Sequence, residues 1–562
     1  MRVREFLTTK SLVALLSFVV FAVAASLTPS PWRDGPLLEL VPQAPPGFRD
    51  PAPLIQWPAA DDVRAEGFAI ELDLSHATPE TSSPPSQTKA PRPQHDESEA
   101  ASSSPAETAV EVGAPAPAAR EEKPVADPRD VALLASLRQL REQLPQKTNH
   151  LEIPCRRARE YPDGSPILET QEELTNGDCK RKSLDNFYHS LRQRARKEPG
   201  LTRWSQYGDS LVVGDTLTGE LRRLFQAQFG DGGHGFVFIG QPLRAFGFEN
   251  IRVGATDDWN VRTIVRHAPE GGDLFGLGGA EFRASRASNL LLQSPRNDEL
   301  GKDLEFFHVF YFAPSGVTSG SFRFMLDGET RTETFETTPG SSGVYTIRVP
   351  RGEHRVRFSD FSPHLRFYGV VSETSGPGVV IDNIGQVSAR EEHLLKINAE
   401  QWRDQLALRD PNLVAFFYGV NAASSSGSRI EERDSYADNY REVIRRATTG
   451  APKRDCLVLS LLTRGTREGG KISPTGAVAV LNREQRRAAL SSGCAFFDTT
   501  AMMGGPNATR RWAESRPTLL GADLAHPTPA GYREIARRLY ADLIDGFIDY
   551  LERQIQAGGT RP

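Results

Sequence analysis

The chain has 562 residues, which is enough for two or three domains. Its 67 Lys and Arg against 72 Asp and Glu give a formal net charge of −5, so the chain lacks the basic character of a nucleic-acid-binding protein. None of its four cysteines stands in a Cys/His spacing typical of zinc, and neither a metal nor a cofactor is expected.

Residues 1–27 are predicted to direct the chain out of the cytoplasm. Arg2, Arg4 and Lys10 precede an apolar run of about 17 residues, and the sequence AVA at 22–24 is typical of a signal cleavage site. The run is at the lower limit for spanning a bilayer, so a cleaved signal peptide and an N-terminal membrane anchor both remain open. In either case we expect the rest of the chain to be exported, as a periplasmic, cell-surface or secreted protein.

Residues 28–129 are predicted to form a disordered linker. Pro, Ala, Ser and Glu dominate the segment, and it has too little apolar periodicity to offset the entropy of an ordered chain. Proline keeps such a segment extended. Two roles remain open: a tether that lets an anchored protein sample a polymer such as the cell wall, or a plain spacer.

The folded part is predicted to begin with two helices. Residues 131–144 have helical apolar spacing, and a second stretch around Phe187 shows it again. Cys155 and Cys179 lie between these stretches in a segment rich in charge and turns. In an exported protein this position favours a disulfide that fixes the start of the domain.

A serine follows the first apolar strand. The sequence RWSQYG leads into Gly208-Asp209-Ser210-Leu211, and apolar residues at helical spacing over 216–229 predict the next helix. A strand-to-helix turn exposes the serine hydroxyl, and glycine at its start allows a close approach of the backbone. The N-terminus of a helix also favours an oxyanion at this point.

The sequence changes character between residues 236 and 378. Short runs of alternating apolar and polar residues predict an inserted antiparallel β-sandwich, with binding glycan or covering the active site as possible roles. His234 precedes it in a glycine run that follows a helix, so the run is no phosphate loop, and His234 is a turn residue or site wall. Four aromatic residues are candidates either for stacking on sugar rings or for the core: Trp259, Phe306, Tyr311 and Phe361.

Helices and short apolar strands alternate after residue 378. Strands buried on both faces and separated by helices predict a parallel sheet covered by helices on each side. Cys456 and Cys494 begin two of these strands, where buried free thiols are expected. The expected helices are 395–408, 435–448, 482–491 and one from Pro529, and the expected strands are 413–419, 456–462 and 494–500.

The last of these helices is preceded by Asp523-Leu524-Ala525-His526. An Asp three residues before a His can hold its Nδ1–H while Nε2 faces a serine. Ser210, Gly385 and Asn421 each follow a predicted strand, and ligands bind parallel sheets at the carboxyl ends of the strands. This combination predicts ester hydrolysis through a serine nucleophile.

These blocks resemble those of the SGNH (GDSL-type) hydrolases. The resemblance implies that Ser210 is the nucleophile, His526 the base and Asp523 its orienter. It further implies an oxyanion hole formed by the N–H groups of Ser210 and Gly385 and by the side-chain amide of Asn421. The asparagine block departs from the family at Ala422, where Asp is usual, but that position is not one of the catalytic groups.

The resemblance covers residues 183–552 with a large interruption, as in the periplasmic peptidoglycan O-acetylesterases, which carry a carbohydrate-binding-like β-sandwich there. It implies an α/β fold: a flavodoxin-like three-layer αβα domain with a parallel sheet, interrupted by an antiparallel β-sandwich. The first part of the hydrolase domain would occupy 130–235, the insertion 236–378 and the remainder 379–562.

Three functions remain open from the sequence. The first is an esterase that removes O-acetyl groups from peptidoglycan or another extracellular polysaccharide. The second is a polysaccharide O-acetyltransferase, in which a sugar hydroxyl replaces water as the acceptor. The third is a glycan-binding protein with a degenerate catalytic domain, which the complete set of Ser210, Asp523, His526 and Asn421 disfavours. The expected partner is an O-acylated glycan substrate.

Overall fold

The computed structural model describes residues 127–145, 149–156, 159–160, 166–167, 181–240, 247–268, 274–295, 300–424 and 435–556. The predicted export signal, the linker up to residue 126 and Cys179 lie outside the described residues. Within those ranges no helix is both long enough and apolar enough to cross a bilayer.

A six-stranded sheet forms the centre of the fold, in the order β1-β23-β20-β19-β6-β18. All neighbours in it are parallel except β1, which pairs antiparallel with β23. The inner strands β19, β20 and β23 are buried along their whole length, and β6 is buried except at Leu201 and Arg203, which confirms the parallel sheet that the apolar runs predict. The strands are β1 (Leu151–Glu152), β6 (Leu201–Gly208), β18 (Gly378–Gly385), β19 (Leu413–Phe417), β20 (Asp455–Leu459) and β23 (Ala495–Phe497).

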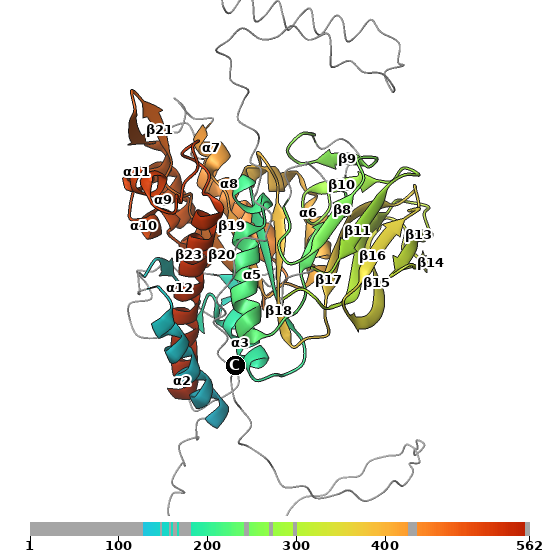
Figure 1. Ribbon diagram of the computed structural model, residues 1–562, viewed down its shortest axis with the longest axis horizontal. Helices are drawn as coiled ribbons and strands as arrows, with labels where there is room; N and C mark the ends of the chain where they lie inside the picture. Colours follow the sequence, from blue (N-terminus) through green and yellow to red (C-terminus); the bar gives the residue numbers. More distant parts are fainter. Residues whose placement is uncertain are drawn as a thin grey trace, which may run out of the picture. The chain divides into compact units, whose positions relative to one another are not determined.

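Helices cover both faces of this sheet. On β6, Trp204 packs against Phe187 and Phe225, whereas Tyr207 packs against Trp402. Residues three apart on a strand point to opposite faces, so these helices lie on opposite sides. One group contains α2 (Pro128–Gln143), α3 (Asp185–Ala195), α5 (Thr216–Phe229) and α12 (Pro529–Gln556); the other contains α6 (Ala399–Arg409), α8 (Ser435–Thr448) and α9 (Ala477–Ser491) (Figure 1).

Two antiparallel sheets occupy most of the region between β6 and β18, in green to yellow in Figure 1. The first has the order β15-β12-β17-β10-β9, with β7 also paired to β17, and the second β14-β13-β16-β11-β8. Their bounds are β7 (Gly235–Phe238), β8 (Arg252–Ala255), β9 (Asn260–Thr263), β10 (Ala280–Arg283), β11 (Asn289–Gln293), β12 (Leu304–Ala313), β13 (Ser319–Leu326), β14 (Glu329–Glu336), β15 (Ser341–Gly352), β16 (Arg355–Ser359) and β17 (Arg366–Glu373).

The two antiparallel sheets pack on each other through aromatic rings. Phe307 on β12 lies 6.1 Å from Phe324 on β13 and 5.9 Å from Phe358 on β16, measured between ring centroids. Phe322 on β13 lies 5.7 Å from Tyr345 on β15. Alternate residues of each strand therefore fill the space between the sheets, and the remaining residues face outward.

Three of the four aromatic residues considered for sugar stacking belong to this core. Trp259, Tyr311 and Phe361 are only 6%, 7% and 5% exposed, and the rings of Trp259 and Phe361 lie 5.0 Å apart. Phe306 is partly exposed, but the Arg348 guanidinium lies over its ring at 5.4 Å. The sugar-stacking interpretation is therefore wrong for the three buried residues. Tyr311 points inward from β12, whereas Trp259 and Phe361 lie in turns next to strands and pack on each other in the core.

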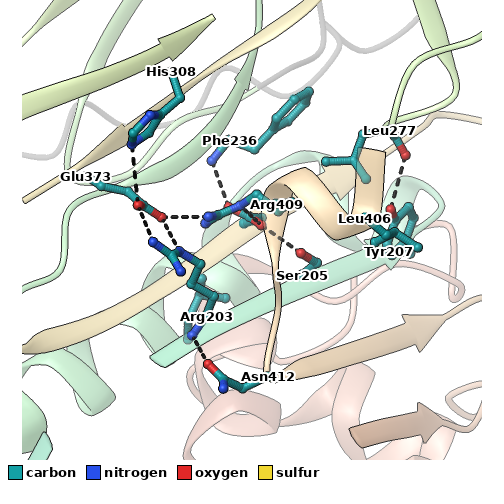
Figure 2. Close-up of polar contacts among 12 residues, drawn as sticks. Arg203, Ser205, Tyr207, Phe236, Leu277, His308, Glu373, Leu406, Arg409 and Asn412 are labelled. Atoms are coloured by element: carbon teal, nitrogen blue, oxygen red, sulfur yellow. Dashed lines mark hydrogen bonds and ion pairs between the residues drawn. The ribbon is translucent and has the colours of Figure 1, made fainter. Parts of the chain in front are cut away.

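A buried ion-pair network joins the parallel sheet to the antiparallel sheets (Figure 2). Arg409 of α6 donates to Asp382 of β18 at 2.8 and 2.9 Å and to Glu373 of β17 at 2.6 Å. Arg203 of β6 adds two bonds to Glu373, at 2.8 and 2.9 Å. Burial alone would raise the pKa of Glu373, but Arg409, with His308 and Arg203, holds it well below its usual value.

The glycine run before β7 lies against this network. Gly233 has φ 104°, and a Cβ on it would come within 2.7 Å of the Glu373 Cα. A Cβ on Gly235 would come within 2.6 Å of Asp382 Oδ1. Only glycine therefore allows the chain to pass between the sheets here. His234 is 1% exposed, and burial lowers its pKa to about 3, so it is a neutral core residue.

Cys456 and Cys494 form a disulfide, with their Cα atoms 4.7 Å apart. The prediction of two buried free thiols is wrong. The two residues stand at the same level of the neighbouring parallel strands β20 and β23, where Leu457 is opposite Ala495. Two cysteines at that level face each other, but the sequence does not reveal which strands are neighbours. The Cys155–Cys179 pair remains a prediction, because Cys179 lies outside the described residues.

Candidate active site

Ser210 begins a sharp turn at the end of β6. It is the first residue of the short helix α4 (Ser210–Val213), and Asp209 caps that helix by accepting from the Leu211 N–H at 3.0 Å. A Cβ at Gly208 would come within 2.2 Å of Val212 Cγ2 and 2.9 Å of the Phe417 carbonyl oxygen. Glycine at 208 is thus required for the turn that presents the Ser210 hydroxyl.

Ser210, His526 and Asp523 form a continuous hydrogen-bonded chain. Ser210 Oγ lies 2.7 Å from His526 Nε2, and His526 Nδ1 lies 2.6 Å from Asp523 Oδ2. The other carboxylate oxygen, Oδ1, accepts the N–H groups of Ala525 and His526, each at 3.1 Å. Leu524 between them has φ 56°, which folds the segment so that both side chains meet. The structure thus brings Ser210 together with the Asp523–His526 pair, which lies more than 300 positions later in the sequence.

This geometry shifts the pKa values of Asp523 and His526 in opposite directions. Burial would raise the pKa of Asp523, but the hydrogen bonds from His526 and Ala525 lower it to about 2. The hydrogen bond to Asp523 in turn raises the pKa of His526, against the opposing effect of burial. An ionised carboxylate beside the ring is suited to stabilise an imidazolium, the form that His526 would take if it accepted the serine proton.

Asp209 connects the serine turn with the loop after β19. Its side chain is fully buried and accepts from the N–H groups of Leu211 at 3.0 Å and Gly419 at 3.3 Å. Burial raises its pKa to about 6, against the effect of these donors and of His526. The sequence marks Asp209 only as part of the serine block, because its second partner is 210 residues away.

Asn421 and Gly385 lie at the same edge of the sheet as Ser210. Asn421 is at the start of α7 (Val420–Ser424), and its Nδ2 donates to the Ala389 carbonyl at 2.9 Å, which fixes the amide against the turn after β18. Gly385 ends β18 in register with Gly208, and its N–H donates to Asn383 Oδ1 at 3.2 Å. The oxyanion role of both residues remains a prediction. The Gly385 N–H already donates to Asn383, and this bond would compete with donation to an oxyanion.

Arg464 is a further site residue that no sequence motif marks. It follows β20, and its Nη1 donates to the Val420 carbonyl at 2.9 Å, while the next residue, Gly465, donates its N–H to the Leu524 carbonyl at 3.0 Å. One short segment thus holds both the Asn421 loop and the Asp523–His526 turn. The positive charge of Arg464 also acts to lower the pKa of His526.

Within the described ranges, no group of three or more His, Cys, Asp or Glu side chains is placed to hold a metal ion. The hydrogen-bonded series Ser210–His526–Asp523 is suited to acyl transfer through a covalent intermediate on the serine. In such an arrangement the histidine and the carboxylate activate the serine hydroxyl.

Comparison with known families agrees with this geometry. Residues 364–534 match the model of the GDSL-like lipase/acylhydrolase family. The chain carries a GDSL-type (SGNH) acylhydrolase domain. The family indicated by the serine and histidine blocks is confirmed, and this acylhydrolase is an enzyme that acts on ester bonds. Ser210 lies upstream of the matched segment, because the antiparallel sheets separate it from the rest of the domain.

This acylhydrolase is similar to several solved structures. One described as a peptidoglycan O-acetylesterase matches with a TM-score of 0.54 and 19% sequence identity, over 65% of this chain and 96% of that chain. A variant of Axe2, an acetyl xylan esterase from Geobacillus stearothermophilus, matches with a TM-score of 0.23 and 18% identity, over 30% of this chain and 73% of that chain. The first match shows the fold. No curated protein matches the chain in sequence.

Proposed function

We propose that this acylhydrolase is an exported serine esterase that removes O-acetyl groups from peptidoglycan or another extracellular polysaccharide. The observation that carries the proposal is the hydrogen-bonded chain Ser210–His526–Asp523, with distances of 2.7 and 2.6 Å. Such a chain activates a hydroxyl that is otherwise a weak nucleophile.

The reaction follows from the geometry in two steps. Ser210 Oγ attacks the acetyl carbonyl while His526 Nε2 takes its proton, and Asp523 stabilises the resulting imidazolium. His526 then returns the proton to the departing sugar oxygen, which leaves an acetyl group on Ser210. Water, deprotonated by His526, releases acetate and restores the serine. The negative oxygen of each tetrahedral intermediate would lie between Ser210 N–H and the Asn421 amide.

Two observations support export. The apolar segment of residues 1–27 has the composition of a signal. Cys456 and Cys494 form a disulfide between buried strands. Disulfides form and persist in oxidising compartments, whereas cysteine pairs in the cytosol are kept reduced. The periplasm or the cell surface is the location that we propose.

The acetylated glycan is proposed from the likeness to the peptidoglycan O-acetylesterase. That structure is matched over 96% of its length, so the likeness extends beyond a minimal hydrolase domain. The Axe2 relative, named as an acetyl xylan esterase, is the reason for including a second polysaccharide in the test.

The test is acetate release by the purified full chain from p-nitrophenyl acetate, O-acetylated peptidoglycan and acetylated xylan. A fluorophosphonate should label Ser210, identified by mass spectrometry of the peptide. Acetate release from a polymer that Ser210→Ala abolishes is the expected result. Labelling elsewhere, or polymer activity that survives Ser210→Ala, would refute the assignment. Acetyl groups appearing on an added sugar instead of as acetate would identify a transferase.

A further inference from the structure

The outer face of the second antiparallel sheet is a surface that the proposed chemistry does not use. Leu290, Leu292, Val356 and Phe358 are buried, so they point toward the first sheet. Pairing places the residues between them on the opposite, outer face. Leu291 is opposite Arg357, and Gln293 is opposite both Arg355 and Arg252.

Three arginines gather on this outer face. Arg252, Gln293 and Arg355 lie side by side on β8, β11 and β16, and Arg357 stands two residues along β16 from Arg355. At about 4.8 Å between strands, Arg252 and Arg355 are roughly 10 Å apart at the backbone, and Arg355 and Arg357 about 7 Å. All three are exposed. We call Arg252, Arg355 and Arg357, with Gln293 between them, the arginine face.

No ion pair within the described ranges neutralises the arginine face. Among the residues that the structure describes, no carboxylate forms an ion pair with Arg252, Arg355 or Arg357, whereas the neighbouring Arg323 pairs with Asp360 at 3.1 Å. The nearest acid by hydrogen bond is Asp327, whose carboxylate accepts the Arg355 backbone N–H at 2.7 Å. Although the chain has a net charge of −5, three arginines without an ion pair among the described residues thus gather on one face of this sheet.

The surroundings of the arginines are polar or aliphatic. In addition to Gln293, Asn289 and Ser359 face outward in the next row, and Leu291 and Met325 are partly exposed between them. No large aromatic or aliphatic side chain of the described residues on this sheet is fully exposed, as insertion into a lipid surface would require. Guanidinium groups bind carboxylates with two parallel hydrogen bonds, and side-chain amides bind sugar hydroxyls.

We infer that the arginine face binds a polysaccharide strand that carries carboxylates, with Arg252 and Arg355 on successive acidic units and Gln293 on the hydroxyls between them. This deepens the proposed function, on which it rests, by naming the substrate class: an acidic, O-acetylated glycan. The spacing of the two arginines is of the order of one disaccharide, the period at which acidic groups recur in many such polymers.

The test is affinity electrophoresis of the full chain in gels that contain carboxymethyl cellulose or hydroxyethyl cellulose, the same backbone with and without carboxylates. Retardation by the carboxylated polymer alone is expected, and it should fade as salt is raised. The triple variant Arg252→Ser, Arg355→Ser, Arg357→Ser is expected to bind about tenfold more weakly, since three exposed ion pairs are lost together.

A matched control removes the same charge from the same antiparallel region. Arg323, Arg331 and Arg351 are exposed but paired with Asp360, Glu333 and Asp303. Changing these three to serine should leave binding within about twofold of the wild type, because their charge is already neutralised. Equal losses in the two triple variants would overturn the inference. So would equally tight, arginine-dependent binding to phosphatidylglycerol vesicles or single-stranded DNA, which would identify another polyanion.

Activity on p-nitrophenyl acetate separates this inference from the proposed function. The first triple variant should hydrolyse that small ester at the wild-type rate and lose kcat/KM only on an acidic acetylated polymer. Carboxylate binding in a protein without any esterase activity would refute the proposed function and leave the arginine face standing. Esterase activity without selective binding of the carboxylated polymer would refute the arginine face as a binding site and leave the proposed function standing.

Discussion

The parallel and antiparallel sheets of this protein use polar residues in opposite ways. In the parallel sheet, strands are buried on both faces and the polar groups meet at the carboxyl edge, where Ser210, Asp209 and Asn421 are each held by named partners. In the antiparallel region, charged residues are spread over outer faces, and Arg355 and Arg357 have no ionic partner among the described residues. Positioned groups suit bond breaking, whereas unpaired exposed ones suit recognition of a polymer.

The largest expected effect is on the parallel side. Ser210→Ala should lower kcat on p-nitrophenyl acetate by on the order of 10⁴-fold or more, since the nucleophile is removed and only transition-state contacts remain. The thermal unfolding curve should stay unchanged, because within the described part of the chain the Ser210 hydroxyl bonds to His526 alone. Ser359→Ala, on the antiparallel region, is the control and should retain full activity. A Ser210→Ala enzyme with wild-type kcat would contradict the assignment of bond breaking to the edge of the parallel sheet.

The next effect separates the base from its orienter. His526→Ala should lose nearly as much activity as the serine variant, whereas Asp523→Asn should retain more, because an amide can still hold the ring in place. The measurement is kcat on p-nitrophenyl acetate for both variants at several pH values. Wild-type kcat in His526→Ala would require another base within reach of Ser210.

A third prediction tests whether the two regions are one folding unit. Arg409→Met leaves Asp382 and Glu373 buried with one ionic partner fewer, which should cost about 3–5 kcal/mol of the free energy of unfolding. The depressed pKa of Glu373 means that its contribution is present at neutral pH and is lost as the pH falls through that lowered value. Chemical denaturation at pH 7 and at acidic pH measures both effects. Two separate transitions in the wild type would show that the regions unfold independently.

Asn421→Ala should lower kcat by about 100- to 1,000-fold, or roughly 3–4 kcal/mol, with little change in KM, if its amide binds the oxyanion. The bond from Asn421 to the Ala389 carbonyl offers a different outcome. If the variant loses thermal stability and keeps its kcat, Asn421 only anchors the turn after β18.

The smallest effect is expected at Arg464. His526 acts as a base only when neutral, so activity falls as the pH drops through its raised pKa. Three charged groups set that pKa: Asp523 and Asp209 raise it, and Arg464 lowers it. Arg464→Gln should therefore move the acid limb of kcat/KM to higher pH, and Arg464→Lys should restore it. An unchanged profile with lower kcat would mean that Arg464 acts only through its bond to Val420.

Much of the parallel region could be predicted from sequence, because its helices have strong apolar periodicity. The helices α5, α8 and α12 begin where apolar spacing places them, and α9 begins at Ala477, five residues earlier than expected. The sequence could not show which strands are neighbours in the sheet. Two contacts depend on that order: the disulfide between Cys456 and Cys494, and the hydrogen bond from Arg464 to the Val420 carbonyl. Both depend on strand order, which local patterns do not encode.

The aromatic residues of the antiparallel region illustrate a second limit. Period-two alternation correctly suggests strands there, but it does not say which of the two faces is inside. Tyr311 on β12 is an example. Trp259 and Phe361 lie in turns next to strands, where alternation gives no direction, and only the packing of their rings 5.0 Å apart places them in the core. The exposed arginines carry no motif at all and become visible only when the register aligns Arg252 with Arg355 across Gln293.

The network around Arg409 limits how this enzyme can be engineered. Glu373 belongs to the antiparallel region, whereas Arg203 lies on β6 of the parallel sheet and Arg409 lies on α6, which covers that sheet. Excising residues 236–378 would remove Glu373, the ionic partner that Arg203 and the buried Arg409 share, and would leave Asp382 as the ionic partner of Arg409 among the described residues. It would also remove β17, the strand that lies against Gly233 and Gly235. The antiparallel region therefore cannot be exchanged between enzymes as an independent module. A shortened enzyme would first need a redesigned contact surface around Arg409.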